Sequence, residues 1–586
     1  DISSDEDEPA VNVPPEAEIE SEVLPAEDDQ REFDTVPING VKRVQLDDID
    51  EVENVIKWFT NDERSTIKDR TPLAVLAAAL IAATTSKVDV TIPMWNKACL
   101  KELDAMSENQ TFSLVKLPAG KRAVGCRWVF TMKNGPTGEF AKARLVAQGF
   151  SQQEGIDYNE TFSPVIRYDS VRVLLAVAAS KKFKVHQMDV TTAFLHGDID
   201  AEIYMKQPPG FENTKDPTAV WKLHKSIYGL KQSPLCWYKK MLTALERFGF
   251  QKASAEHGVF YLSNDKGHCM LGLYVDDLII AGSSDAAISD VKKYLATQFK
   301  MKDLGLINGR FLGLDIKLTD DGIIVSMATY IKDMLANTGL AECHRETTPM
   351  MLNPYKLVVE EPGEELDAKE SSTYRSIIGM LLFAANCLRY DISFAVGLLS
   401  RFLSKPHRIH LSCAKRILRY LSGTPLNIHY GAAPSVTLAG YTDSDWAGDV
   451  GDRKSIGGYM FLINGKPVTW SSKKQPSVSL LTCEAEYIAL TEAVKEAMFL
   501  VLLFKYIGAG VNRPIIYCDN NSAINLAKHP TNHRNLKHIS IRYHFIRDLV
   551  NIVFVLQRVD TKANVADMMT TALAVPQFRR LLLFLK

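Results

Sequence analysis

The segment LGLYVDDLIIAG, residues 271–282, is the sharpest local signal in the chain, because two adjacent acids interrupt an otherwise apolar run. Short apolar runs on either side of a polar pair are typical of two buried strands joined by a tight turn. Asp276 and Asp277 are therefore expected at the tip of a β-hairpin. An isolated Asp-Asp pair is also common in ordinary turns, so the motif alone leaves a purely structural role open.

A further acid lies about ninety residues upstream, in VHQMDVTTAFLHGDI at 185–199. There Asp189 follows a strand-like run and precedes a turn. Carboxylates from separate strands can hold two divalent cations about 3.5–4 Å apart, which activate a 3′-hydroxyl and steady a leaving pyrophosphate. Asp189 together with the hairpin acids therefore predicts nucleotidyl transfer.

The C-terminal part of the chain predicts a second site of the same kind. YTDSDWAGD (441–449) ends a strand with acids, two further strand signals and a long helix at 483–503 follow, and IIYCDNNSAINLAK (515–528) gives a strand that ends at Asp519. A β-β-β-α-β-α order builds one open sheet, and acids at strand ends gather at one edge of it.

Helical geometry selects one glutamate of the long helix. Two residues rotate by about 200°, so Glu484 and Glu486 face opposite ways, and Glu486 shares its stripe with Ala489, Leu490 and Ala493. Glu486 is therefore expected to face inward. A buried glutamate needs a partner such as a metal site, whereas Glu484 can simply favour the helix dipole in the first turn.

Composition is that of a multidomain protein: 586 residues with 46% hydrophobic side chains are ample for several packed cores. The net charge of −2 hides an acidic tail, because residues 1–35 hold 14 Asp and Glu against one Arg and the remainder carries a net charge of about +11. The tail is expected to be a solvated, disordered linker or a docking arm, and the basic body is compatible with a polyanionic ligand.

Two classes of protein are excluded by smaller features. The longest apolar stretch, at 72–83, is too short to cross a bilayer or to act as a secretion signal, so no membrane span is expected. Nine scattered cysteines without zinc spacing predict reduced thiols in an intracellular protein, with no disulfides and no structural zinc.

Collinear motifs carry a resemblance to a known family. MDVTTAFLHGDI and YVDDLIIAG, with RWVF, ARLVAQGFSQQEGIDYNETFSPV, KSIYGLKQSP and FLGLDI, resemble the reverse transcriptase of copia-type (Ty1/copia) LTR retrotransposon Pol polyproteins. TDSDWAGD, WSSKKQ, EAEYIAL and CDNNSAI resemble the ribonuclease H that follows it, and the resemblance runs from about residue 93 to the end. It implies an α+β multidomain fold: a right-hand polymerase of fingers, palm and thumb with a helical connection, then an α/β ribonuclease H-like domain with a mixed sheet.

The resemblance also implies domains and roles. The expected domains are an acidic, largely disordered tail and linker at 1–87, fingers and palm at 88–340, a helical thumb or connection at 341–436, and ribonuclease H at 437–586. Magnesium ions, two in each active site and replaceable by Mn²⁺, are expected on seven catalytic acids: Asp189, Asp276, Asp277, Asp443, Glu486, Asp519 and Asp567.

Five further residues are implied to bind the incoming nucleotide. Lys133 and Arg144 resemble fingers residues that hold the triphosphate, although either can be a solvated surface charge. Phe194 resembles a steric gate against the ribose 2′-hydroxyl, with core packing as its alternative. Gly229 and Lys231 resemble the border of the nucleotide pocket, where glycine permits close backbone approach. FLGLDI at 311–316 resembles a primer grip and by itself indicates an ordinary edge strand, and His538 either helps product release or packs.

The family implies copying of retrotransposon RNA into double-stranded DNA and degradation of RNA in the hybrid. Implied partners are an RNA template, a DNA or tRNA primer, an RNA–DNA hybrid, dNTPs, and the element's own Gag particle and integrase, in a cytoplasmic virus-like particle with nuclear entry. The first residue, Asp rather than Met, suits a fragment, and no aspartic-protease motif is present.

Two alternatives remain. EHGVF (256–260) and CLRYDI (387–392) depart from the family pattern and indicate a diverged or decaying copy. The first alternative is accordingly a domesticated or decayed copy that only binds nucleic acid. The second, a polymerase that copies RNA or primes telomeres, does not explain a fused ribonuclease H.

Overall fold

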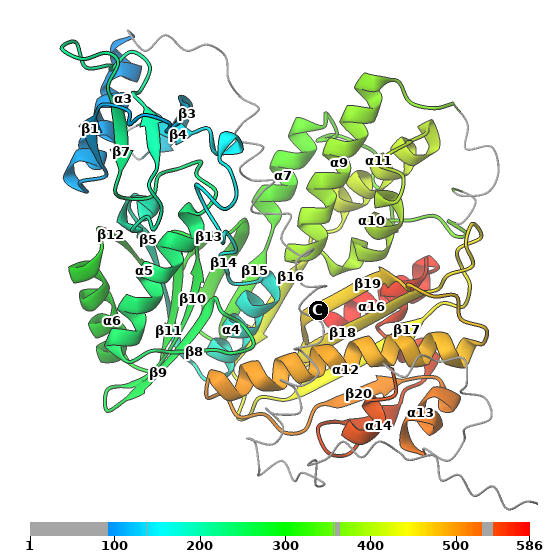
Figure 1. Cartoon of the computed structure of the whole chain (residues 1–586). Helices are drawn as coiled ribbons and strands as arrows, with labels where there is room; N and C mark the ends of the chain where they lie inside the picture. The colour runs from blue at the N-terminus through cyan, green and yellow to red at the C-terminus, as the bar shows by residue number, and fades with distance from the viewer. Residues whose placement is uncertain (1–91, 136–137, 355–356, 358–363, 530–542) are drawn as a thin grey trace, which may run out of the picture.

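The structure is a computed structural model that describes residues 92–135, 138–354, 357, 364–529 and 543–586 (Figure 1). Within these ranges it is a mixed α+β protein with five sheets, which confirms the expected α+β class. The acidic tail, the apolar stretch at 72–83 and His538 lie outside the described residues.

The N-terminal part, at the upper left of Figure 1, contains a four-stranded sheet and a long hairpin. The sheet has the order β1-β7-β6-β2, and helix α3 packs against strand β4 of the hairpin β3–β4. The bounds are α3 Pro93–Glu108, β1 Phe112–Val115, β2 Ala123–Val124, β3 Cys126–Gly135, β4 Gly138–Ala147, β6 Tyr204–Lys206 and β7 Val220–Leu223.

A six-stranded sheet with the order β12-β5-β11-β10-β9-β8 follows. Its strands are β5 Lys184–Val190, β8 Gln251–Lys252, β9 Val259–Asn264, β10 Gly267–Tyr274, β11 Asp277–Gly282 and β12 Met301–Leu306. Helix α4 (Tyr168–Ser180) covers one face, and α5 (Ser233–Phe248) and α6 (Asp285–Gln298) cover the other. Because both faces are buried, β11 is apolar at every position after its first, and the predicted hairpin over 271–282 is confirmed.

A third sheet, β13-β14-β15-β16, joins distant parts of the chain. Its strands are β13 Gly309–Phe311, β14 Leu314–Thr319, β15 Gly322–Ser326 and β16 Asn427–Gly431. FLGLDI is therefore not one edge strand: it turns between β13 and β14 at Leu312 and Gly313, which both have positive φ. Helices α7 (Ala328–Asn337), α9 (Ala368–Cys387), α10 (Ser393–Ser400) and α11 (Arg408–Gly423) pack together, which confirms the predicted helical region at 371–421.

The C-terminal sheet has the order β19-β18-β17-β20-β21. Strands β17, β20 and β21 are parallel, whereas β18 and β19 are antiparallel additions, so the sheet is mixed as expected. The bounds are β17 Leu438–Ser444, β18 Ile456–Ile463, β19 Lys466–Lys474, α12 Thr482–Tyr506, β20 Ile515–Cys518, α13 Asn521–Lys528, α14 Ile546–Leu549, β21 Val555–Arg558, α15 Asp567–Thr570 and α16 Val575–Leu585.

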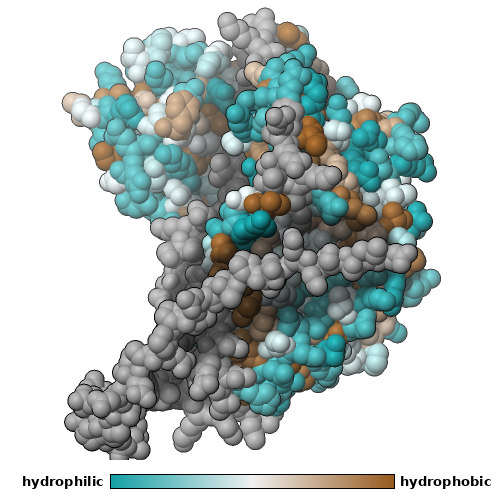
Figure 2. All heavy atoms as spheres, turned by 90° about the vertical axis from the view of Figure 1, so that its right-hand side faces the viewer, coloured by the Kyte–Doolittle hydropathy of each residue, from teal (hydrophilic) through white to brown (hydrophobic). Residues whose placement is uncertain are grey.

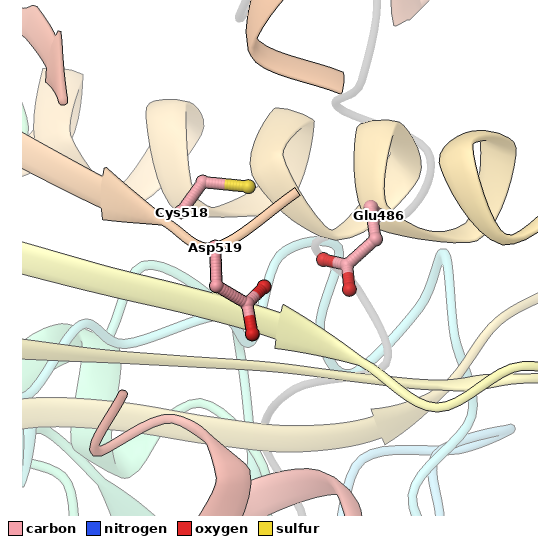
Figure 3. Close-up of side chains that lie close together, drawn as sticks. All are labelled: Glu486, Cys518 and Asp519. Carbon is pink, nitrogen blue, oxygen red and sulfur yellow. The ribbon is translucent and has the colours of Figure 1, made fainter. Parts of the chain in front are cut away.

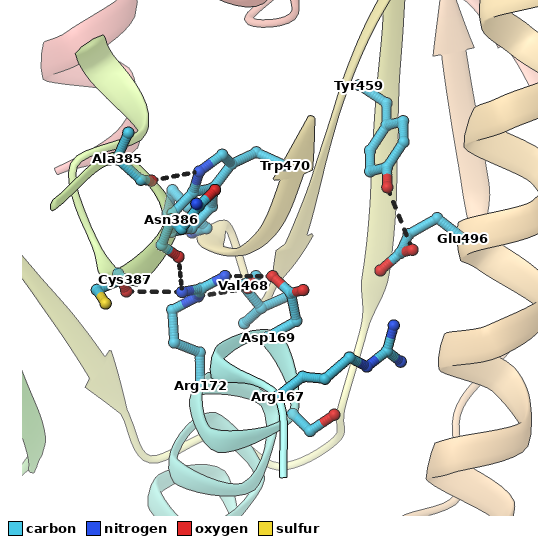
Figure 4. Close-up of polar contacts among 12 residues, drawn as sticks. Arg167, Asp169, Arg172, Ala385, Asn386, Cys387, Tyr459, Val468, Trp470 and Glu496 are labelled. Atoms are coloured by element: carbon cyan, nitrogen blue, oxygen red, sulfur yellow. Dashed lines mark hydrogen bonds and ion pairs between the residues drawn. The ribbon is translucent and has the colours of Figure 1, made fainter. Parts of the chain in front are cut away.

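Helix α4 joins this C-terminal sheet to the six-stranded one. Every residue from Ser170 to Ser180 is buried, because α4 also contacts β16 and β19. Near its start the guanidinium of Arg172, which has no exposed surface, stacks 3.8 Å from the centre of the Trp470 ring (Figure 4). It donates hydrogen bonds of 2.6–2.9 Å to the carbonyl oxygens of Val468, Asn386 and Cys387.

The surface on one side of the molecule is mostly polar (Figure 2). On the side of the molecule shown in Figure 2, the described residues are largely hydrophilic and the hydrophobic ones form small separate patches. Among the described helices, none is both long enough and apolar enough to cross a bilayer.

Candidate active sites

The first carboxylate cluster lies where two neighbouring strands of the six-stranded sheet meet. Asp189, near the end of β5, is paired in register with Asp277, the first residue of β11. Asp276 occupies the two-residue turn between β10 and β11, and its carbonyl accepts a hydrogen bond of 2.8 Å from the amide of Val190. The structure therefore brings the three predicted acids together.

The turn that carries Asp276 is held from outside. Val275 has φ +54, a left-handed conformation that a β-branched residue rarely adopts. The indole nitrogen of the buried Trp237 donates a hydrogen bond of 2.6 Å to the carbonyl of Val275. This contact fixes the strained turn and the direction of the acids beside it.

Burial shapes the protonation of this cluster. Desolvation, followed by the charges of Asp276 and Asp189, raises the pKa of Asp277 to about 6. Desolvation, together with Asp189, also raises the pKa of Asp276. Carboxylates that repel one another in a low dielectric are stabilised by a cation between them, and an all-oxygen donor set suits Mg²⁺ or Mn²⁺.

Basic side chains line the same cleft as these acids. The cleft includes Asp189, Asp276 and Tyr228 together with Lys142, Arg144 and Lys302. The Nζ atom of Lys302 on β12 lies 3.0 Å from Oδ2 of Asp189. Lys142 and Lys302 were not predicted, although Lys142 stands two positions before Arg144 on β4 and so shares its face.

The predicted nucleotide-binding residues fall into two groups. Arg144 lines the cleft, with its guanidinium 5.3 Å from the centre of the Tyr228 ring. Lys133 is exposed on β3, and its charge partly opposes the rise in the pKa of Asp277 that desolvation causes, so it faces the same region. Phe194 is half-buried and makes an edge-on contact with Tyr228, with the ring centres 4.9 Å apart.

Gly229 and Lys231 lie beyond Tyr228. Gly229 has φ +93, and a Cβ there would lie 2.1 Å from the carbonyl oxygen of Ala147, so glycine permits close backbone approach here. The backbone that lies against Gly229 is that of strand β4. Lys231 donates a hydrogen bond of 2.8 Å to the hydroxyl of Tyr158 and is not among the described residues that line the cleft.

The second carboxylate cluster lies at one edge of the C-terminal sheet. Asp443 is the next-to-last residue of β17, Asp519 follows β20, and Asp567 begins α15; one carboxylate oxygen from each lies within 4.8 Å of the other two. Glu486 on α12 approaches Asp519 from the helix that covers the sheet (Figure 3). The four predicted acids therefore converge on one edge.

Both glutamates of α12 are buried, Glu484 at 8% exposed as well as Glu486, although only Glu486 was expected to face inward; they differ in their hydrogen bonds. Glu486 is 4% exposed and its Oε2 atom has no hydrogen-bond partner. Glu484 is in the first turn of the helix, where its carboxylate accepts a hydrogen bond of 2.8 Å from the amide of Leu480. Of these two glutamates, Glu486 is the one with an unsatisfied oxygen beside the cluster.

Electrostatics again favours a bound cation at this edge. Burial, with neighbouring carboxylates as the second cause, raises the pKa of Asp567 to about 8 and that of Glu486 well above its ordinary value. Burial also raises the pKa of Asp443 to about 6, although the Thr570 hydroxyl donates a hydrogen bond to it. Buried unpartnered oxygens on Glu486 and Asp567 fit divalent cations that prefer oxygen ligands.

Two contacts at this edge were not predicted from the sequence. The Asn564 amide donates a hydrogen bond of 3.0 Å to the carbonyl of Thr442, which holds the segment before Asp567 against β17. The Thr570 hydroxyl reaches Asp443 from the same short helix, α15. Both residues lie close in sequence to Asp567, and no motif distinguished them.

Known proteins resemble this chain over most of its length. Residues 109–352 match the family model described as reverse transcriptase (RNA-dependent DNA polymerase). The retrovirus-related Pol polyprotein from transposon TNT 1-94 of Nicotiana tabacum is 40% identical over 482 residues, which are 81% of this chain and 36% of that protein. That from transposon RE1 of Arabidopsis thaliana is 38% identical over 491 residues, 83% of this chain and 33% of the relative.

A shorter relative is covered in full. The putative transposon Ty5-1 protein of Saccharomyces cerevisiae is 40% identical over 312 residues, which are 53% of this chain and 100% of the relative. The structure of the foamy viral protease-reverse transcriptase in complex with RNA/DNA hybrid aligns with 84% of this chain and 63% of that chain, at 13% identity and a TM-score of 0.41, a likeness too weak to assign domains. The chain spans about a third of the length of the plant relatives. It belongs to the Pol polyprotein family of Ty1/copia-type retrotransposons, with its reverse transcriptase domain at residues 109–352.

Proposed function

We propose that the chain is an RNA-directed DNA polymerase with a fused ribonuclease H, which copies retrotransposon RNA into double-stranded DNA and degrades the RNA of the hybrid. The observation that carries the proposal is the pair of separate carboxylate clusters, each at the strand ends of its own sheet. One consists of Asp189, Asp276 and Asp277, and the other of Asp443, Glu486, Asp519 and Asp567.

The architecture supports an assignment of subdomains. The hairpin β3–β4 with α3 corresponds to fingers, the six-stranded sheet to the palm, helices α9 to α11 to the thumb or connection, and the sheet β17–β21 with α12 to ribonuclease H. Strand β16 lies within the helical region expected at 341–436 and pairs with β15, so this region is tied to the palm side by backbone hydrogen bonds.

In the polymerase site, Asp189, Asp276 and Asp277 would hold two Mg²⁺ ions. When bound, the ions supply activation of the primer 3′-hydroxyl and charge stabilisation of the leaving pyrophosphate. Arg144, Lys142 and Lys133 neutralise and orient the triphosphate from the β3–β4 side. Phe194 supports Tyr228 at the border of the cleft, where the sugar of the incoming nucleotide is expected.

In the nuclease site, Asp443, Glu486, Asp519 and Asp567 would hold the second pair of ions. When bound, these ions supply activation of the water that attacks the RNA phosphodiester. Thr570 and Asn564 orient the acids: the first donates to Asp443, and the second holds the segment that leads to Asp567.

The two activities require each other in this proposal. The polymerase makes a DNA–RNA hybrid, the nuclease removes its RNA strand, and the polymerase then makes the second DNA strand. The ligands are an RNA template, a DNA or tRNA primer, dNTPs and the hybrid. The proposed setting is a cytoplasmic virus-like particle with the element's Gag and integrase, followed by entry into the nucleus.

The test separates the two sites with conservative variants. Purified chain with Mg²⁺ is assayed for primer extension on RNA and for cleavage of a preformed hybrid. Asp277→Asn is expected to lose at least a hundredfold in extension while cleavage persists, and Asp519→Asn is expected to show the reverse pattern. Each variant is the other's matched control, since both replace one carboxylate by an amide.

A folded protein that neither extends a primer nor cleaves a hybrid would overturn the proposal. If such a protein still bound the hybrid, the result would favour a decayed or domesticated copy that only binds nucleic acid. The seven clustered acids argue against this second function, because binding alone does not need them.

A further inference from the structure

A cysteine stands among the acids of the C-terminal edge. Cys518, the last residue of β20, is fully buried, and its Sγ atom lies within 4.8 Å of carboxylate oxygens of Glu486 and Asp519 (Figure 3). Adjacent residues in a strand normally point to opposite faces, but β20 ends at Cys518, so Asp519 is free of that alternation. The side chains of Cys518 and Asp519 can therefore both lie beside the carboxylate of Glu486.

An independent observation shows that this group lacks a ligand. Glu486 is 4% exposed, points towards Cys518 and Asp519, and has a buried Oε2 atom without a hydrogen-bond partner. The Cys518 thiol has only a distant contact of 3.9 Å with the carbonyl of Asn520. A buried unpartnered carboxylate oxygen beside a weakly bonded thiol is the donor set that a metal ion would complete.

We propose that Glu486, Cys518 and Asp519 form a binding site for a thiophilic divalent cation, Zn²⁺ or Cd²⁺. Mg²⁺ takes oxygen ligands, whereas Zn²⁺ and Cd²⁺ bind thiolate sulfur as well as carboxylate oxygen. Three protein ligands and one solvent molecule complete a tetrahedral Zn²⁺ site.

The geometry needs only a small adjustment. Bonds of about 2.0–2.3 Å place the ligand atoms of a tetrahedral ion roughly 3.5 Å apart. Because the donor atoms already lie within 4.8 Å of one another, they must close by at most about 1.3 Å. The thiol loses its proton to solvent as the metal–sulfur bond forms, and no oxidant or reductant is involved.

The site overlaps the proposed nuclease. Asp519 belongs both to this group and to the oxygen-only group with Asp443 and Asp567. An ion held by Cys518 therefore occupies ligands that the Mg²⁺ ions of the nuclease would use. This consequence rests on the proposed function: Zn²⁺ and Cd²⁺ inhibit hybrid cleavage, and a chelator that removes the ion reverses the inhibition.

Direct binding of Cd²⁺ tests the site without any cleavage assay. The full chain, kept reduced and free of Mg²⁺, is titrated with Cd²⁺ by calorimetry and by the ultraviolet sulfur-to-cadmium charge-transfer band. Because the described residues include other cysteines, the measured quantity is the difference in bound Cd²⁺ between each variant and the parent. Cys518→Ser is expected to lose one equivalent of bound Cd²⁺ and its absorbance.

The matched control is Cys413→Ser on α11, a thiol that is equally buried and belongs to neither described metal-ligand group. This variant is expected to keep the equivalent. Glu486→Gln retains the thiol and is expected to bind Cd²⁺ at least tenfold more weakly. A folded Cys518→Ser that binds Cd²⁺ as the parent does would overturn the proposal, and, should that variant not fold, unchanged affinity in Glu486→Gln would overturn it instead.

Failure of the proposed function has a different signature. If the parent cleaves no hybrid with Mg²⁺ while Cys518→Ser still loses its Cd²⁺ equivalent, the nuclease is refuted and the thiophilic site stands. If the parent cleaves hybrid and Cd²⁺ binding does not depend on Cys518, the nuclease stands and the thiophilic site is refuted.

Discussion

Lys302 competes with the cation that the polymerase acids are expected to bind. Its ammonium group lies 3.0 Å from Asp189 in a pair that is partly open to solvent. Partly exposed ion pairs contribute up to about 1 kcal/mol, which corresponds to roughly a fivefold change in cation affinity. Lys302→Met is therefore expected to lower the Mg²⁺ concentration for half-maximal primer extension by about two- to fivefold.

Lys300→Met is the matched control, since Lys300 pairs at 3.3 Å with Glu108, which is not one of the three clustered acids. It should leave the Mg²⁺ requirement of extension unchanged. An equal requirement in parent and Lys302→Met would show that Lys302 does not oppose the cation.

The raised pKa values of the clustered acids make stability depend on pH. For Asp277 and Asp443, at about 6, and Asp567, at about 8, the folded state binds the proton more tightly than the unfolded state. Their contribution is fully present below about pH 4 and is lost as pH rises through 6 and then 8. Mg²⁺ is expected to raise the melting temperature by a few degrees more at about pH 8.5 than at about pH 5, because it replaces the missing protons.

Differential scanning calorimetry at both pH values, with and without Mg²⁺, checks this prediction. Asp443→Asn removes one of the titrating acids and should reduce the pH dependence. An increase of the same size at both pH values would mean that the acids do not bind the ion in place of protons.

At the scale of elements, the sequence predicted most of what positions the sites. The apolar runs around the Asp pair predicted the β10–β11 hairpin. Strands that are buried on both faces are apolar at nearly every position, so they are easy to recognise in a sequence. The helical stripe of Glu486 predicted α12 and its inward face. By contrast, strand β21 and the short helix α15 have no periodicity of their own, and β16 pairs with β15 across about a hundred residues.

Side chains that act between elements could not be predicted at all. Arg172 and Trp470 lie far apart in the chain, and only the folded arrangement shows that the arginine is buried against the indole. Residues in the two segments that depart from the family pattern also make buried contacts that the sequence did not indicate. Glu256 in EHGVF accepts a hydrogen bond of 2.8 Å from Ser170, and Asp391 in CLRYDI forms a fully buried ion pair of 2.6 Å with Arg389.

The Arg172 contacts predict a large effect on stability. Arg172→Met removes the donor to three carbonyl groups and leaves the carboxylate of Asp169 without its partner. Breaking a buried charged contact of this kind typically costs about 3–5 kcal/mol. Urea denaturation of Arg172→Met should therefore show a clearly lower midpoint than that of the parent.

Arg375→Met on α9 is the control, because Arg375 is exposed. It should change the free energy of unfolding by less than about 0.5 kcal/mol. If both variants had the same midpoint, Arg172 would not stabilise the junction between α4, α9 and β19.

At the scale of the whole molecule, affinity for an RNA–DNA hybrid should depend strongly on salt. The basic residues around the first cleft, among them Lys142 and Arg144, are placed to contact phosphates. Each phosphate contact contributes about −0.9 to the slope of log affinity against log salt concentration for a duplex. Fluorescence anisotropy should therefore show affinity falling steeply with salt, and Arg144→Met should make the slope less negative by about one. Affinity that does not change with salt would contradict binding through the backbone.

The burial of α4 on all sides has a practical consequence for anyone who divides this protein. Residues at its end form hydrogen bonds with the part of the chain after residue 437. Lys181 donates one of 2.7 Å to the carbonyl of Gly508, and Asn464 donates one of 2.8 Å to Ser180. A polymerase half that ends before residue 437 would expose an apolar flank to water and would tend to aggregate. Inactivating the proposed nuclease by a point substitution, rather than by deletion, is therefore the way to study synthesis alone.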